Sequence, residues 1–177
     1  MSNKIWEFTG ETKIHFGITL RRIRAAVEFK LKCGIIIAKG ELGGWIEKES
    51  NLYGDAWVSD NAMVSDNARV YGDAWVSDNA MVSGNAWVYD NARVYGNAWV
   101  YGDAEIKSSK DYCVYKNIWS SLRWFTYTRS NKMWKVGCFY GTGSELIAKA
   151  YKDSEKSGKC YEAIVKAQEE IEKVMDV

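Results

Sequence analysis

From Gly54 to Ile106 the sequence reads GDAWVS-DNAMVS-DNARVY-GDAWVS-DNAMVS-GNAWVY-DNARVY-GNAWVY-GDAEI, a six-residue unit that repeats without a slip. Every unit has alanine at its third position and an aliphatic residue at its fifth, from Val58 to Ile106. Extended backwards, the same frame places Leu52 and Ile46 at the aliphatic position and so adds two degenerate units. A fixed short period of this kind is typical of a solenoid.

Each unit combines one short strand with one corner. The aliphatic residue stands between two outward-facing residues, so its side chain points inward. The corner is made by glycine or aspartate followed by asparagine or aspartate, residues that tolerate left-handed backbone and form tight turns. Three corners close a triangular coil of eighteen residues. Successive coils then pair as parallel strands do, about 4.8 Å apart.

The spacing of aliphatic and small residues resembles the hexapeptide repeat of left-handed parallel β-helices, and the resemblance implies the hand of the coil. A disordered low-complexity tract is the alternative interpretation. It is disfavoured because Val and Ala keep their phase and because Trp, Met and Tyr are abundant. We therefore predict a mainly β protein, built on a short left-handed parallel β-helix of about 3–4 coils over residues 42–107.

Residues 1–41 do not repeat and predict a small N-terminal β cap. An open solenoid end exposes unpaired backbone groups, so a cap is expected there. The strand candidates are residues 4–8, 12–16, 18–24, 27–31 and 35–37.

Residues 108–177 predict a β-hairpin followed by two helices. The segments 122–128 and 133–139 alternate as strands on either side of a polar turn. The first helix should open at Ser144 and end near Gly158, and the second should begin near Lys159. The apolar stripe of the second helix predicts that this helix closes the end of the prism, with a role in joining subunits as the alternative.

Charge is unevenly distributed along the 177 residues, although the formal net charge is only +1. Residues 1–40 carry eight basic and three acidic residues, residues 41–107 carry four and eleven, and residues 108–177 carry twelve and nine. Phosphate binding needs clustered cations. We therefore expect no DNA to bind along the acidic shaft.

The sequence also indicates the cellular compartment in which we expect the protein. It contains no apolar run of eighteen residues and no apolar segment typical of a signal peptide near its start, so we expect no membrane partner. The four cysteines are widely spaced and form no C-x-x-C pair. We expect buried thiols in a reducing cytoplasm rather than disulfides or a zinc site.

Three segments outside the regular repeat carry a family resemblance. They are GITLRRIRA at 17–25, KGELGGWIE at 39–47 ahead of Asn51-Leu52, and VGCFYGT at 136–142. In this order they resemble segments of the hexapeptide-repeat proteins common in bacteriophages and prophages, a family of unassigned function. The resemblance covers most of the chain. It implies a phage context, a left-handed β-helix, a trimer, and a place in the cytoplasm of the bacterial host cell.

The residue inventory argues against catalysis. Acyltransferases of this fold use a coil histidine as general base, whereas the one histidine here, His15, precedes the repeat. One histidine cannot build a three-histidine zinc site, and the repeat serines have no base nearby. Glycine motifs for phosphates or dinucleotides are absent. We expect no enzyme activity, cofactor or metal, and an acyltransferase-like enzyme is the most distant alternative.

The outward residues form columns on three faces. Face 1 carries Trp57, Trp75 and Arg93 beside Ser59, Ser77 and Tyr95; face 2 carries Trp45, Met63, Met81 and Trp99 beside Ser65, Ser83 and Tyr101; face 3 carries Arg69, Trp87 and Glu105 beside Tyr53, Tyr71 and Tyr89. Apolar faces of this extent exceed what a soluble monomer normally exposes. They predict the seam of a homotrimer with parallel axes, or a ligand or partner site, and grooves between subunits would combine the two.

Aromatic faces stack on bases and guanidinium groups pair with phosphates. We therefore expect a non-catalytic, oligomeric binding protein. Its expected role is that of a phage anti-defence factor, which sequesters an anionic nucleotide-type signal or blocks a host protein such as a CRISPR effector. The alternative is a structural, virion-associated oligomer. The candidate ligand- or partner-binding residues are Trp57, Trp75, Arg93, Tyr95, Arg69, Trp87, Tyr71, Tyr89, Arg22 and Arg24, the last two of which a solvated strand face explains equally well.

Overall fold

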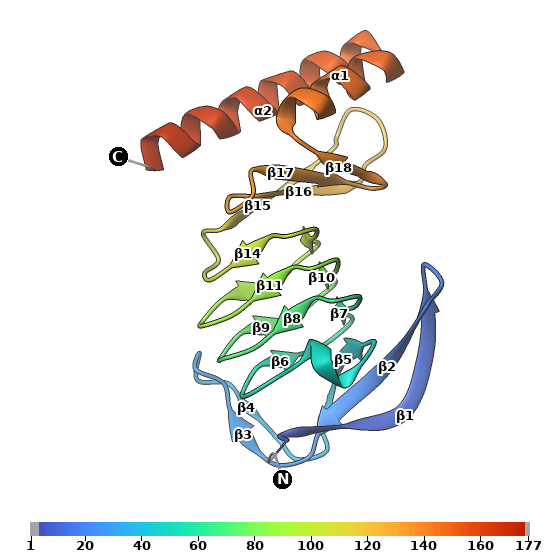
Figure 1. Cartoon of the computed structure of the whole chain (residues 1–177), viewed down its shortest axis with the longest axis vertical. Helices are drawn as coiled ribbons and strands as arrows, with labels where there is room; N and C mark the ends of the chain where they lie inside the picture. Colours follow the sequence, from blue (N-terminus) through green and yellow to red (C-terminus); the bar gives the residue numbers. More distant parts are fainter. Residues whose placement is uncertain (1–3, 176–177) are drawn as a thin grey trace.

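The computed structural model describes residues 4–175, so the expected cap (1–41) and C-terminal region (108–177) each extend slightly outside the described part. A prism of stacked coils forms the middle of the molecule (Figure 1). Strands of the N-terminal segment lie at one end of the prism, and a second sheet with two helices lies at the other. The predicted β-solenoid, its β cap, and the C-terminal hairpin with two helices are confirmed.

Nine two-residue strands follow the repeat. Each pairs in parallel with a strand eighteen residues away in the sequence, as when Met81 pairs with Met63 and with Trp99. Backbone bonds such as that from the Trp57 amide to the Ala74 carbonyl, 2.9 Å, join successive coils. The strands are β6 (Trp57–Val58), β7 (Met63–Val64), β8 (Arg69–Val70), β9 (Trp75–Val76), β10 (Met81–Val82), β11 (Trp87–Val88), β12 (Arg93–Val94), β13 (Trp99–Val100) and β14 (Glu105–Ile106).

The core of the prism is the column of inward residues. Every aliphatic and alanine position of the repeat from Ala56 to Ile106 is fully buried. At the corners Asp60, Asp66 and Asp78 adopt positive φ of 56–58°, the left-handed backbone that the repeat predicts. The Asp78 carboxylate accepts the amide of Gly96 in the next coil at 2.8 Å, so stacked corner carboxylates are stabilised by backbone N–H groups.

The N-terminal segment forms a long hairpin and a small two-stranded sheet. Strands β1 (Trp6–His15) and β2 (Ile18–Ala25) pair antiparallel, and β2 continues onto β5 (Leu42–Ile46), the first strand of face 2. Residues 4–8 and 12–16 were expected as separate strands, but they belong to one strand with an irregularity between Phe8 and Thr12. Strands β3 (Phe29–Lys30) and β4 (Ile36–Ile37) pair separately, and the short helix η1 (Glu49–Asn51) precedes the first regular coil.

Glycine is required where β5 meets the first coil. A Cβ on Gly44 would lie 2.7 Å from the Ala62 carbonyl oxygen, and one on Gly43 would lie 2.7 Å from that of Val58. Only glycine permits this approach without a backbone shift. The Gly-Gly pair therefore lets the cap join the prism directly.

The C-terminal region is a four-stranded antiparallel sheet with two helices. The sheet holds β15 (Tyr112–Lys116), β16 (Trp124–Thr128), β17 (Met133–Val136) and β18 (Phe139–Gly141); the helices are α1 (Gly143–Asp153) and α2 (Glu155–Met175). The predicted hairpin is confirmed as β16 and β17, whereas β15 was not anticipated. The expected first-helix end near Gly158 is wrong, because Ser154 is extended and α2 has already begun at Glu155. Gly158 instead packs against the Tyr151 ring.

The sheet, and not the second helix, closes the prism. The Trp99 amide donates to Thr126 Oγ1 and the Glu105 amide to Ser130 Oγ, each at 2.8 Å. Helix α2 packs on the sheet's other side, where Tyr161 and Val165 join a core with Phe125. The expectation that α2 closes the prism is therefore wrong. Within residues 4–175, neither helix is both long and apolar enough to cross a membrane.

Candidate ligand-binding groove

A large concavity lies between the β1–β2 hairpin, face 2 and the C-terminal sheet. Because β2 is anchored on β5, the hairpin rises beside the prism instead of closing its end (Figure 1). The hollow has a volume of about 780 Å³. Met63, Met81 and Trp99 from face 2 line it together with His15 and Phe16 from the hairpin.

Two parallel aromatic rings stand at one end of the groove. Phe16, at the hairpin turn, lies 6.0 Å from the Trp99 ring with only 6° between their planes. The Trp99 indole is held in place because its Nε1 donates to Ser83 Oγ at 3.1 Å. Phe16 is 76% exposed, so one ring is fixed and the other is free to contact a ligand. Such rings suit a flat apolar or aromatic group.

Lys135 places a buried cation beside these rings. Only 8% of the surface of Lys135 is exposed. Its ammonium nitrogen lies 4.0 Å from the Trp99 ring centroid and 4.3 Å from the Tyr101 ring centroid. No carboxylate of residues 4–175 forms an ion pair with it. Burial lowers the pKa of Lys135 below its usual value of 10.5. The Trp99 and Tyr101 ring faces offset part of this charge, so an anion in the groove would be stabilised.

The other charged residues of the groove also favour an anionic ligand. Arg123 lines it and is exposed, and among residues 4–175 Asp66 is the one acidic residue that lines it. The Asp66 carboxylate already accepts the Gly84 amide at 3.0 Å. The groove is thus basic although the shaft around it is acidic.

His15 adds an unpartnered polar atom. Its Nε2 is buried and has no hydrogen-bond partner in the described part of the chain. Burial, and then the nearby Lys13, lower the pKa of His15, so the imidazole is neutral at pH 7. A neutral imidazole offers one donor and one acceptor.

The residues expected on face 1 are partly covered. Trp57 was expected on an exposed outer face, but this was wrong: it keeps the outward register of Trp75 and is nevertheless fully buried, with Phe29 edge-on at 5.3 Å. The β3–β4 segment covers it. Trp75 is half-buried and donates from Nε1 to Ser59 Oγ at 2.9 Å. It shares a hollow of about 200 Å³ with the exposed Arg93. Tyr95 is exposed, does not line this hollow, and has its ring 6.4 Å from that of Tyr112.

The residues expected on face 3 do come together. Arg69 lies 5.6 Å from the Trp87 ring centroid, and Tyr71 stacks on Tyr89 at 5.1 Å with 5° between the planes. None of them lines the groove. The stacking of these side chains on one face is confirmed, and this face is separate from the groove.

Arg22 and Arg24 have partners within the cap. Arg24 pairs with Glu7 at 2.7 Å. Arg22 pairs with Glu11 at 3.4 Å and donates from Nε to the Gly43 carbonyl at 3.3 Å. These contacts explain both arginines as structural residues of the hairpin.

Sequence reasoning missed His15, Phe16, Arg123 and Lys135 as groove residues. The Met81–Trp99 column on face 2 was visible in the repeat and was the available signal. What the repeat could not indicate was which flanking segments would approach this column. Cys138, expected as a buried thiol, is also exposed and lines the groove.

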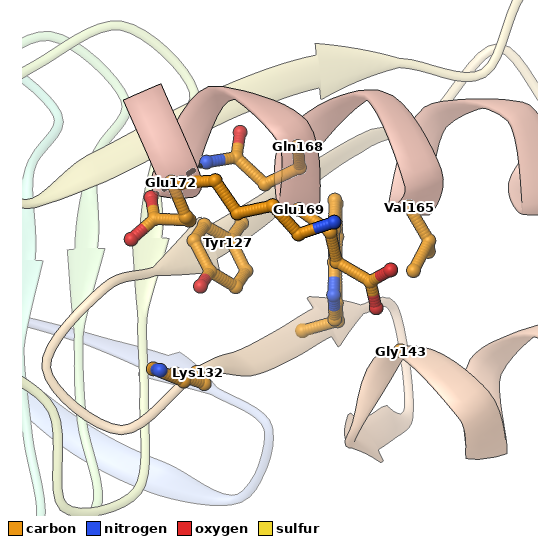
Figure 2. A pocket seen from close by; sticks show the side chains of 9 residues that line it. Tyr127, Lys132, Gly143, Val165, Gln168, Glu169 and Glu172 are labelled. Atoms are coloured by element: carbon orange, nitrogen blue, oxygen red, sulfur yellow. Dashed lines mark hydrogen bonds between the residues drawn. The ribbon is translucent and has the colours of Figure 1, made fainter. Parts of the chain in front are cut away.

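A second hollow, of about 360 Å³, lies between α2 and the C-terminal sheet. Figure 2 shows Glu169 and Glu172 of α2 near Tyr127, with Lys132 on the opposite side. Glu172 pairs with Arg129 at 3.0 Å and accepts from Gln168 at 2.8 Å. This hollow is a weaker candidate than the groove, because it has both acidic and basic groups and because Glu172 already has partners in Arg129 and Gln168.

Comparison with known proteins identifies the repeat. The family model of the YdcK Beta solenoid repeat matches residues 56–72, 62–78, 74–90 and 86–102. These matches support a β-solenoid repeat and leave the cap and the C-terminal region outside. No curated protein matches the chain.

Proposed function

We propose that this chain is a non-catalytic, oligomeric binding protein whose groove takes an anionic, planar small molecule of the nucleotide type. The observation that carries the proposal is Lys135, a residue only 8% exposed whose ammonium has ring faces but no carboxylate of the described residues beside it. A partly desolvated cation attracts an anion more strongly than a fully hydrated one, so a ligand anion that pairs with it gains more than it would at the surface.

The groove's shape fits such a ligand. Its volume of about 780 Å³ lies in the range of small-molecule sites, and its floor is apolar. A base would stack on Trp99 and Phe16, and phosphate oxygens would meet Lys135 and Arg123.

Binding rather than catalysis is supported by the state of the groove's polar groups. The Ser83 hydroxyl accepts from the Trp99 indole, and the imidazole of His15 has no partner at Nε2 to orient it as a base. General-base catalysis needs a base within hydrogen-bond reach of the proton it removes. These groups therefore suit recognition.

The resemblance to phage and prophage proteins suggests the biological role. A phage protein that sequesters an anionic nucleotide-type signal would act as an anti-defence factor inside the host cell. A second candidate is blockade of a host protein such as a CRISPR effector, favoured by the acidic shaft, in which residues 41–107 carry eleven acidic and four basic residues. Native mass spectrometry after incubation with host lysate separates these roles from a purely structural one. It would detect a retained small molecule, a retained protein, or neither.

The direct test is calorimetric titration with mononucleotides and cyclic dinucleotides. Lys135→Met should weaken binding about tenfold or more, because a charge-assisted contact is lost. Lys149→Met, an exposed change on α1, is the control and should bind as the native protein does. If no anion of the panel binds, or if Lys135→Met binds equally well, the proposal fails.

A further inference from the structure

Face 3, formed by β8, β11 and β14, keeps its tryptophan and a neighbouring tyrosine open. The groove lies over face 2, and β3–β4 covers Trp57 on face 1. On face 3, by contrast, Trp87 is 40% exposed and Tyr53 is 46% exposed. Exposed aromatic residues on a flat strand face are typical of a contact surface.

The charges of face 3 are opposite at its two ends. Register places Arg69 and Glu105 on either side of Trp87, one coil away each. Two steps of about 4.8 Å separate their backbones, and the strand that carries Trp87 lies between them. Neither residue forms an ion pair within the part of the chain that the structure describes.

We propose that face 3 binds face 3 of a second copy of this chain, with the two prisms antiparallel. The two copies are related by a two-fold axis that lies in the interface at the level of Trp87, perpendicular to the long axis of the prism. This rotation reverses the order of the coils in the partner. It places Arg69 of each copy opposite Glu105 of the other and the two Trp87 rings face to face. The same operation sets Tyr71 opposite Lys107, again an aromatic–cation pair.

The tyrosines beside this column, Tyr71 and Tyr89, are already held in place within one chain. Tyr71 and Tyr89 stack, and the Tyr89 hydroxyl donates to Glu105 at 3.1 Å. Side chains held in place before association lose less conformational entropy when the interface forms. If the two prisms were parallel, each residue would lie at the same height as the same residue of the partner. Arg69 would then not lie opposite Glu105.

This inference goes beyond ligand binding and concerns a separate face. Its test is sedimentation velocity from about 1 to about 100 μM, the range expected for a modest interface. The native protein should dimerise. Arg69→Glu and Glu105→Arg should each weaken dimerisation about tenfold or more, because each turns two attractive pairs into repulsive ones.

Mixing the two variants supplies the decisive measurement. In a mixed dimer, both sites again hold one glutamate and one arginine, so the mixture should dimerise although each variant alone does not. The double variant, whose net charge is native, should also dimerise. Arg93→Glu on face 1 controls for overall charge and should leave dimerisation unchanged. A native monomer throughout, a trimer insensitive to these changes, or a mixture that stays monomeric would each overturn the proposal.

Discussion

Inward valines are the residues on which the prism depends most. Val76 is fully buried between the valines of the coils on either side, Val58 and Val94. Its side chain has neither a polar partner nor space for water. The same holds for each aliphatic position of the repeat, so the shaft tolerates changes at its outward positions far better than at these.

Val76→Asp should unfold the shaft. It would bury an uncompensated carboxylate, at a cost of several kcal/mol or more. Asn91→Asp, which adds the same charge at an exposed corner, should melt close to the native protein. Circular dichroism during heating compares the two, and a Val76→Asp protein with a native melting curve would show that the inward register is wrong.

Lys135 also predicts a pH dependence of binding. Because burial lowers its pKa below 10.5, the ammonium loses its proton at a lower pH than an exposed lysine does. The protonated form attracts the anion, so affinity should fall as pH rises through this lowered pKa. Lys135→Arg stays charged over the same range and should give a flatter profile. Equal profiles for the two proteins would exclude Lys135 as the anion-binding group.

Among the elements, the β1–β2 hairpin has the clearest consequence for function. It is fixed at its base by β5 and carries Phe16 at its far end, against Trp99. The hairpin therefore does two things, since it extends the sheet of face 2 through β5 and forms one wall of the groove.

The hairpin offers a matched pair of substitutions. Phe16 and Ile14 are 76% and 77% exposed, but Phe16 lines the groove and Ile14 does not. Phe16→Ala should weaken nucleotide binding several-fold through loss of one stacking face, whereas Ile14→Ala should not. Both variants should melt like the native protein. Titration calorimetry decides, and equal losses in the two variants would mean that the tip does not contact the ligand directly.

At the scale of the whole molecule, ligand binding and assembly use different faces. The groove lies over face 2, and the proposed dimer contact lies on face 3. The trimer expected from three open aromatic faces loses part of its basis, because Trp57 is buried beneath the cap and face 2 lines the groove.

The two activities should therefore separate. Arg69→Glu should lose dimerisation and keep nucleotide affinity, and Lys135→Met should do the reverse. Sedimentation and calorimetry on the same preparations measure both. A variant that lost both activities while still melting normally would indicate that the groove is completed only in the dimer.

The repeat alone determined the coil, its eighteen-residue period, the inward column and the contacts among Arg69, Trp87, Tyr71 and Tyr89. These are local consequences, since strand alternation and corner residues place each side chain inward or outward without reference to the rest of the chain. Contacts between residues eighteen positions apart were predictable because the stacking of coils places such residues next to each other.

Only the tertiary structure decided which outward faces stay open and where the groove lies. Trp57 and Trp87 occupy the same position of the repeat, yet one is covered by Phe29 and the other is exposed. The groove joins residues as far apart in sequence as His15, Trp99 and Lys135. Their meeting depends on how the hairpin leaves β5 and how the C-terminal sheet seats on the last coil. Such long-range packing is not encoded in any short period, because it arises from contacts between segments that the repeat does not contain.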